Sequence, residues 1–200
     1  DHLAAGRDNN LNLLRMAAAL LVLVSHSFAL STGSGLAEPW RAVYGCTPGT
    51  VAVDIFFVIS GMLLTHSLLR QRSTMTFVSH RVQRIVPGLV VALALTVFVV
   101  GPWLSTLGTR DYFGSAQPYK HFVRNASIVM PMAFDLPGLF EANPWPKAVN
   151  GSIWTLRYEV FCYGILLMAW VVAPSSCRVK AFEAACLAIA AITLGMRLPE

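Results

Sequence analysis

Hydrophobic residues along the chain fall into five long runs separated by polar or charged stretches. Each run approaches the roughly 20 residues that an α-helix needs to cross about 30 Å of hydrocarbon. The runs do not alternate between apolar and polar positions, as the strands of a membrane barrel do. The pattern therefore predicts an all-α fold, a polytopic transmembrane helix bundle, with spans near residues 11–30, 51–69, 85–107, 153–173 and 181–196.

Composition excludes the main alternatives to a membrane protein. Hydrophobic residues make up 56% of the 200 residues, charged residues make up 12%, and the mean hydropathy is +0.59. A soluble domain carries about 25% charged residues, and a disordered chain is polar and poor in aromatic residues. The excess of 15 Lys and Arg over 10 Asp and Glu is therefore interpreted as a signal of membrane topology, and we expect no nucleic-acid partner.

The basic residues also predict the orientation of the chain. If the N-terminus is cytoplasmic, the inner connecting segments hold seven Lys or Arg in 32 residues, and the outer ones hold five in 65. Positive residues concentrate on the cytoplasmic side of membrane proteins, so we expect a cytoplasmic N-terminus. In that orientation residues 108–152, rich in Pro, Gly and aromatics, form an outer loop of a length that is usually functional or disordered.

Two ionisable residues share one face of the first span. Arg15 and His26 are eleven positions apart, which on a helix is three turns plus about 20°, with roughly 16 Å between them along the axis. Charged groups are costly in hydrocarbon and usually mark function there. Taken alone, Arg15 could be an interfacial anchor and His26 a structural hydrogen-bonding group. Their shared face favours a joint role.

Two carboxylates enter other spans at a similar depth. Asp54 and Glu159 fall, like His26, within roughly 10 Å of the outer boundary of the membrane. A carboxylate beside an imidazole can orient it and stabilise its protonated form, as a catalytic base requires. The alternative is local pairing of each carboxylate with a nearby arginine. Thr155, Glu159 and Tyr163 are spaced four residues apart and form one polar stripe, which suits a bundle-facing surface.

Two arginines stand at the cytoplasmic entrance of the third span. Arg81 and Arg84 are three residues apart, and Pro87 fits the first turn of the helix that follows. Guanidinium groups suit phosphate oxygens. Anchoring to anionic lipid is the alternative interpretation.

The sequence does not predict a metal site. The five histidines are scattered, without paired spacing or an HExxH pattern. The cysteines form no CxxC pair, which argues against zinc and against a disulfide framework; they are Cys46, Cys162, Cys177 and Cys186.

Four motifs occur in the order found in the acyltransferase-3 family of integral membrane O-acyltransferases. Arg15–His26 resembles the Arg-x10-His signature of that family, and residues 53–61, VDIFFVISG, resemble its second-helix motif. Residues 77–87 resemble its basic loop before the third helix, although His80 stands where many members carry a second basic residue. Residues 149–159 resemble its Trp-(Ser/Thr)-Leu-x-x-Glu motif. Together these motifs cover nearly the whole chain.

The resemblance implies a core of about ten membrane helices, so that residues 1–200 would be the N-terminal part of one membrane acyltransferase domain. It implies an enzyme that moves an acyl group, usually acetyl, from cytoplasmic acyl-CoA to a hydroxyl of a cell-surface polysaccharide or other glycan. The expected location is a bacterial inner (plasma) membrane. The expected partners are acyl-CoA, a glycan or glycolipid acceptor and membrane lipid.

The resemblance also implies roles for the ionisable residues. Those expected to hold the CoA phosphates at the inner face are Arg15, Arg81 and Arg84. His26 would act as general base or carry the acyl group itself. Asp54 or Glu159 would orient His26 or bind the acceptor. The residues alone leave open a transporter or exporter subunit whose buried charges line a solute or proton path, and a non-catalytic membrane partner.

Overall fold

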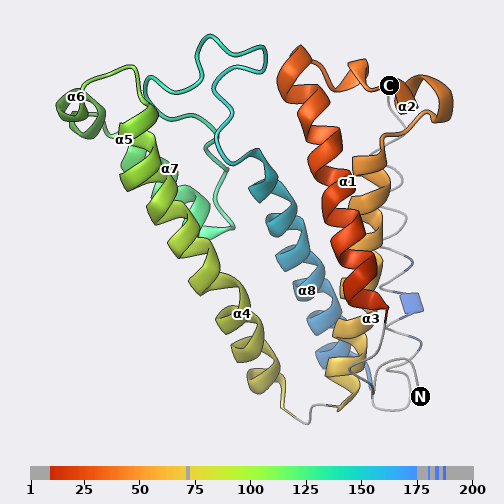
Figure 1. Cartoon of the computed structure of the whole chain (residues 1–200). Coiled ribbons are helices and arrows are strands. Elements are labelled where there is room, and N and C mark those ends of the chain that lie inside the picture. Colours follow the sequence, from red (N-terminus) through yellow and green to blue (C-terminus); the bar gives the residue numbers. More distant parts are fainter. Residues whose placement is uncertain (1–9, 71–72, 175–179, 181–182, 185–186, 188–200) are drawn as a thin grey trace. The chain divides into compact units, whose positions relative to one another are not determined.

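The structure is a computed structural model that describes residues 10–70, 73–174, 180, 183–184 and 187. The secondary structure assigned in this part of the chain is helical, without strands, which confirms the predicted all-α fold (Figure 1). In chain order the elements are α1 (Leu11–Thr32), η1 (Gly35–Ala37), α2 (Pro39–Tyr44), α3 (Pro48–Arg70), α4 (Thr74–Ala94), the π-helical η2 (Leu95–Val100), α5 (Gly101–Leu104), α6 (Thr109–Gly114), α7 (Gln117–Ser127), η3 (Gly151–Ile153) and α8 (Trp154–Val172).

Four segments of the described chain are long and apolar enough to cross a membrane, which confirms a polytopic protein. They are Leu11–Thr32, Pro48–Thr65, Thr74–Leu104 and Gly151–Val172. Helices α1, α3 and α8 begin and end within three residues of the predicted spans. The fifth predicted span, 181–196, lies almost entirely outside the described residues.

The chain divides into two compact units. The first comprises Asp1–Ser60 and Phe140–Ala148, and the second comprises Gly61–Leu139 and Val149–Glu200. The first unit therefore holds α1, α2 and the first half of α3. The second holds the remaining described elements, including α4, α7 and α8.

Helix α4 begins eleven residues before the predicted third span. Ser73 caps it by accepting a hydrogen bond from the Thr76 amide (3.5 Å), and the polar stretch that follows is helical. The expected basic loop before the third helix is thus part of that helix. The prediction that Pro87 occupies the first turn is wrong, because Pro87 lies in the interior of α4. Its ring is exposed there, and the missing N–H removes one hydrogen bond of the helix.

Two apolar clusters pack the helices of the second unit. One joins the C-terminal part of α3 to the start of α4 and to α8, through buried Leu64, Leu68, Phe77 and Leu166. The other surrounds Leu89 and Leu93 of α4, buried Ile128 and the first two turns of α8. Helix α8 therefore packs against α4 through two clusters, one along its first two turns, which include Glu159, and one in the turns that follow, and this packing fixes the position of Glu159.

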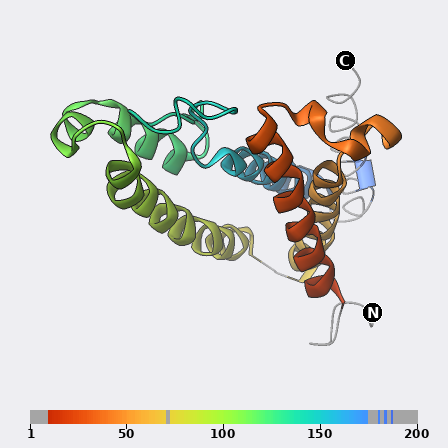
Figure 2. The same cartoon turned by 45° about the horizontal axis from the view of Figure 1, so that its top comes forward.

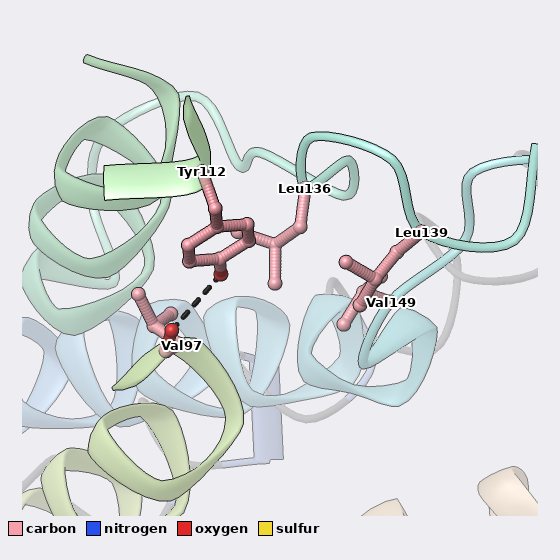
Figure 3. Packing of buried hydrophobic residues seen from close by; sticks show 5 residues of the cluster. All are labelled: Val97, Tyr112, Leu136, Leu139 and Val149. Atoms are coloured by element: carbon pink, nitrogen blue, oxygen red, sulfur yellow. Dashed lines mark hydrogen bonds between the residues drawn. The ribbon is translucent and has the colours of Figure 1, made fainter. Parts of the chain in front are cut away.

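The long segment predicted as an outer loop contains α6 and α7, which gather at the C-terminal end of α4 (Figure 2). Four of its residues, Tyr112, Leu136, Leu139 and Val149, form a buried cluster with Val97 of η2 (Figure 3). The Tyr112 hydroxyl donates to the Val97 carbonyl of η2 at 2.9 Å. Burial raises the pKa of Tyr112 to about 12, so its phenol stays neutral at physiological pH. This segment is therefore a packed subdomain rather than a plain loop.

One polar face of α7 is buried against residues 133–135. Asn125 donates to the Ala133 carbonyl at 2.7 Å and accepts from the Ala133 amide at 3.1 Å. The His121 Nδ1 lies 3.2 Å from the Asp135 carbonyl oxygen, and the Gln117 amide donates to the Asp135 carboxylate. Burial lowers the pKa of His121, and Asp135 opposes this shift only in part. Burial of this face of α7 therefore favours the neutral imidazole of His121.

Candidate active site

Arg15 and His26 lie on one unbroken helix, α1, as their spacing predicts. The Arg15 side chain is half-buried and the His26 side chain is exposed. Because no kink or π-turn interrupts α1, the two side chains leave the same face of the helix. One helix thus presents a guanidinium and an imidazole along a single stripe.

A hydrogen-bond network beside His26 ties α1 to the start of α3. Ser25 donates to the carboxylate of Glu38 (2.7 and 2.8 Å to its two oxygens) and accepts from the Gly49 amide at 3.0 Å. Glu38 is only 2% exposed. A Cβ at Gly49 would lie 2.6 Å from the Ser25 Cβ, so the two helices approach this closely only because residue 49 is glycine. Neither Ser25 nor Glu38 is predicted as a site residue by the spacing of the ionisable groups.

Asp54 follows Gly49 by five residues on α3, in the same unit, and its side chain is half-buried. The start of α3 is fixed by the Thr47 hydroxyl, which accepts from the Thr50 amide at 3.1 Å. The first unit therefore carries three of the predicted site residues on two helices joined at Ser25 and Gly49.

In the second unit, Arg81 contacts two aromatic rings. Its guanidinium carbon is 5.4 Å from the centroid of Phe77, one turn earlier on α4, and 5.8 Å from the centroid of Tyr163 on α8. Rings at such distances attract a cation through their quadrupoles. The buried Arg81 Nε has no hydrogen-bond partner in the described part of the chain. Arg84 is exposed, so the two predicted phosphate-binding arginines occupy different environments.

Tyr163, one of the two aromatic residues beside Arg81, also contacts Glu159. The Tyr163 hydroxyl donates to Glu159 Oε1, one turn apart on α8. Of the predicted polar stripe on α8, Glu159 and Tyr163 thus interact directly, whereas the Thr155 hydroxyl donates to the Ser152 carbonyl at 2.9 Å. Arg81 and Glu159 are therefore connected through one tyrosine. His26 and Asp54 belong to the first unit and Glu159 to the second, so the convergence of these three residues stays a prediction.

The start of α8 is joined to the π-helical segment. Asn150, in the left-handed conformation at φ 54°, donates from its amide to the Thr96 hydroxyl at 2.8 Å. A π-turn displaces backbone carbonyls from the regular ladder and is frequent at functional sites. This bond fixes the entry of the helix that carries Glu159. Sequence reasoning missed Asn150, because its partner lies 54 positions away.

Metal ligands do not cluster in the described residues: no three His, Cys, Asp or Glu side chains there are placed to hold one ion. The candidate site residues described in the two units are arginines, carboxylates, hydroxyls and one exposed imidazole. Such a set can bind phosphate and move protons.

Comparison with known proteins gives the family. The chain matches the family model described as an acyltransferase domain over residues 8–196. The chain belongs to the acyltransferase domain family. This membership confirms the resemblance carried by the four motifs, and the membrane-length helices place the protein among multi-pass membrane proteins.

Several curated proteins resemble this acyltransferase-family chain. An O-acetyl transferase of Shigella phage Sf6 is 36% identical over 157 residues, which cover 78% of this chain and 44% of that protein. Nodulation protein 10 of Rhizobium leguminosarum bv. viciae is 31% identical over 174 residues, 82% of this chain and 45% of its own length. The exopolysaccharide production protein ExoZ of Rhizobium meliloti (strain 1021) is 31% identical over 122 residues, 60% of this chain and 33% of its own.

The chain thus spans less than half the length of these relatives. No solved structure matches it.

Proposed function

We propose that this chain is the N-terminal part of a membrane O-acyltransferase that moves an acyl group, normally acetyl, from cytoplasmic acyl-CoA to a hydroxyl of a cell-surface glycan. The observation that carries the proposal is the Arg15 and His26 stripe on one unbroken, membrane-length helix of an acyltransferase-family chain. The name of the phage relative supports acetyl transfer, and the name of the ExoZ relative supports a polysaccharide acceptor.

The arginines provide the donor site of this proposal. Arg81 and Arg84 would bind the phosphates of CoA near the cytoplasmic end of α4, and Arg15 would bind them from α1. A guanidinium stays charged at any physiological pH and offers a planar fork of N–H groups to phosphate oxygens. The thin pantetheine arm would run along the stripe and carry the thioester toward His26.

The transfer step needs one base and one orienting carboxylate. The His26 imidazole takes the proton of the acceptor hydroxyl while the hydroxyl oxygen attacks the thioester carbonyl. The tetrahedral intermediate then expels the CoA sulfur, which receives the proton from the imidazolium. In the covalent variant, a nitrogen of His26 attacks the thioester carbonyl and expels the CoA thiolate; the acceptor hydroxyl oxygen then attacks the acyl-imidazole and releases His26, and the hydroxyl proton ends on the CoA sulfur. Asp54 or Glu159 orients the imidazole or the acceptor in both variants.

The topology of the proposal follows from its substrates. The N-terminus is cytoplasmic, and the membrane is the bacterial inner membrane. Acyl-CoA is made in the cytoplasm and is too charged to cross hydrocarbon, whereas the glycan is on the outer side. The start of α4 therefore faces the donor, and the packed segment 108–152 faces the acceptor.

The test is transfer of label from acetyl-CoA to glycan in membranes that contain the complete protein. His26→Ala should lower the rate by at least ~100-fold, as loss of a general base does, while the protein still inserts. Ser27→Ala is the matched control, because the Ser27 hydroxyl donates within its own helix, to the Val24 carbonyl at 2.7 Å, and this variant should transfer at the wild-type rate.

Transfer by His26→Ala within tenfold of the wild type would contradict the role of His26. Solute flux without any dependence on acyl-CoA would instead identify a transporter.

A further inference from the structure

Tyr163 contacts two predicted site residues that lie on different helices. Its ring lies 5.8 Å from the guanidinium carbon of Arg81 on α4, and its hydroxyl donates to Glu159 Oε1 on α8. The first is a residue of the proposed donor site, and the second is the carboxylate of the proposed transfer step. One side chain thus contacts a residue proposed to bind the donor and a residue proposed to act in acyl transfer.

The stack around Arg81 is built into the core of the second unit. Phe77, which faces the same guanidinium at 5.4 Å, is 2% exposed and packs with Leu64, Leu68 and Leu166. Tyr163 packs against the same cluster. Two rings anchored in one core leave the guanidinium little freedom to turn. A cation–π contact uses the charge of the guanidinium and none of its hydrogen bonds, so its N–H groups can still donate to a phosphate.

The hydroxyl of Tyr163 restricts the motion of the Glu159 carboxylate, as the ring restricts that of the Arg81 guanidinium. Its donated hydrogen bond occupies Oε1 and restricts rotation of the carboxylate, since donor and acceptor are one turn apart on the same helix. Oε2 can then accept a second hydrogen bond, from an imidazolium or from an acceptor hydroxyl. A carboxylate held in this way does not have to be ordered during each turnover.

We propose that Tyr163 is a positioning residue that serves both substrates: its ring holds Arg81 for the phosphate of the donor, and its hydroxyl holds Glu159 for the acyl transfer step. The proposal rests on the proposed function. It predicts that the two contributions separate, because phenylalanine keeps the ring and loses the hydroxyl, whereas leucine loses both.

The experiment measures kcat and the KM for acetyl-CoA with the complete protein in membranes. Tyr163→Phe should lower kcat by about tenfold, the usual effect of losing a hydrogen bond to a charged group, with KM within about twofold of the wild type. Tyr163→Leu should lower kcat equally and raise KM by about tenfold. A residue needed only for folding would lower the amount of active protein in both variants and would leave KM unchanged.

Tyr158→Phe is the matched control. Tyr158 lies on the same helix, is 41% exposed and packs edge-on against Trp154 at 5.5 Å. Loss of its hydroxyl should change neither kcat nor KM. A wild-type kcat in Tyr163→Phe, or a wild-type KM in Tyr163→Leu, would overturn the inference and leave the proposed function intact.

A chemical measurement tests the inference independently of acyl transfer. Phenylglyoxal modifies accessible arginines, and mass spectrometry gives the rate at Arg81 in each variant. Tyr163→Phe should react like the wild type, and Tyr163→Leu should react several times faster. Equal rates of Arg81 modification in the wild type, Tyr163→Phe and Tyr163→Leu would overturn the inference. A wild type that transferred no acyl group would overturn the proposed function but would not by itself decide whether Tyr163 holds Arg81.

Discussion

Arg81 is held by aromatic rings, whereas Glu38 and Glu159 are held by hydroxyl groups. The rings of Phe77 and Tyr163 contact the guanidinium, and the hydroxyls of Ser25 and Tyr163 donate to the two carboxylates. A guanidinium held by rings keeps its hydrogen-bond donors, and a carboxylate with one donor keeps further lone pairs. Arg81 and Glu159 can therefore be ordered by the fold without losing their capacity to bind a substrate.

His121 makes the stability of the α7 region depend on pH. Its ring is fully buried, and burial lowers its pKa below the ordinary value of about 6.5. The unfolded chain therefore binds a proton at a higher pH than the folded chain does. The stabilising effect of neutral His121 is fully present above pH of about 6.5 and is lost as the pH falls toward the lowered pKa.

We therefore expect the melting temperature of the detergent-solubilised protein to fall between about pH 7.5 and about pH 5.5. His121→Gln, which can still donate to the Asp135 carbonyl but cannot titrate, should show a smaller fall. The measurement is thermal unfolding of both proteins across this range, with hydrogen exchange in residues 117–135 as the local readout. Parallel curves for the two proteins would contradict the assignment.

At the scale of elements, the contact between α1 and α3 depends on one small residue. A side chain at position 49 would collide with Ser25, so Gly49→Ala must push α1 away and weaken the bonds from Ser25 to the Gly49 amide and to Glu38. Overpacking of this kind costs about 1–3 kcal/mol. We expect Gly49→Ala to lower the free energy of unfolding by that amount and to slow acyl transfer, because His26 adjoins the contact.

Ser25→Gly would relieve the collision but would also remove the hydroxyl that donates to buried Glu38, so the double variant should not recover the lost stability. Gly61→Ala is the control on the same helix, since a Cβ there meets no atom within 4 Å. It should change stability by no more than ~1 kcal/mol, in the stabilising direction. A Gly49→Ala protein as stable as Gly61→Ala would refute the close approach of α1 and α3.

The apolar runs predict α1, α3 and α8 well, because apolar residues predominate over the whole length of each helix and ionisable residues interrupt them only singly. They place the start of α4 too late because its first turns are amphipathic: Phe77 is buried in the core while Gln83 and Arg84 are exposed. Helix α7 is not predicted by the apolar pattern, for a different reason. Its buried face is polar, and residues 133–135 satisfy it, a partner that local periodicity cannot indicate.

For the molecule as a whole, spacing predicts the part of the site that lies on one helix. Eleven residues are enough to place Arg15 and His26 on one face, and a spacing of four places Glu159 beside Tyr163. Contacts between distant segments could not be predicted in this way. Ser25 with Glu38, Thr96 with Asn150 and Arg81 with Tyr163 all depend on how helices and loops pack.

The central claim concerns the whole molecule: acyl groups enter from the cytoplasmic side and leave on a glycan at the other side. Sealed membrane vesicles of both orientations, prepared from cells with the complete protein and supplied externally with labelled acetyl-CoA, test it directly. Inside-out vesicles should place alkali-labile label on glycan, and those with His26→Ala should not. Sealed right-side-out vesicles should remain unlabelled until they are permeabilised. Equal labelling of sealed vesicles in both orientations, or labelling with His26→Ala at the wild-type rate, would contradict the account.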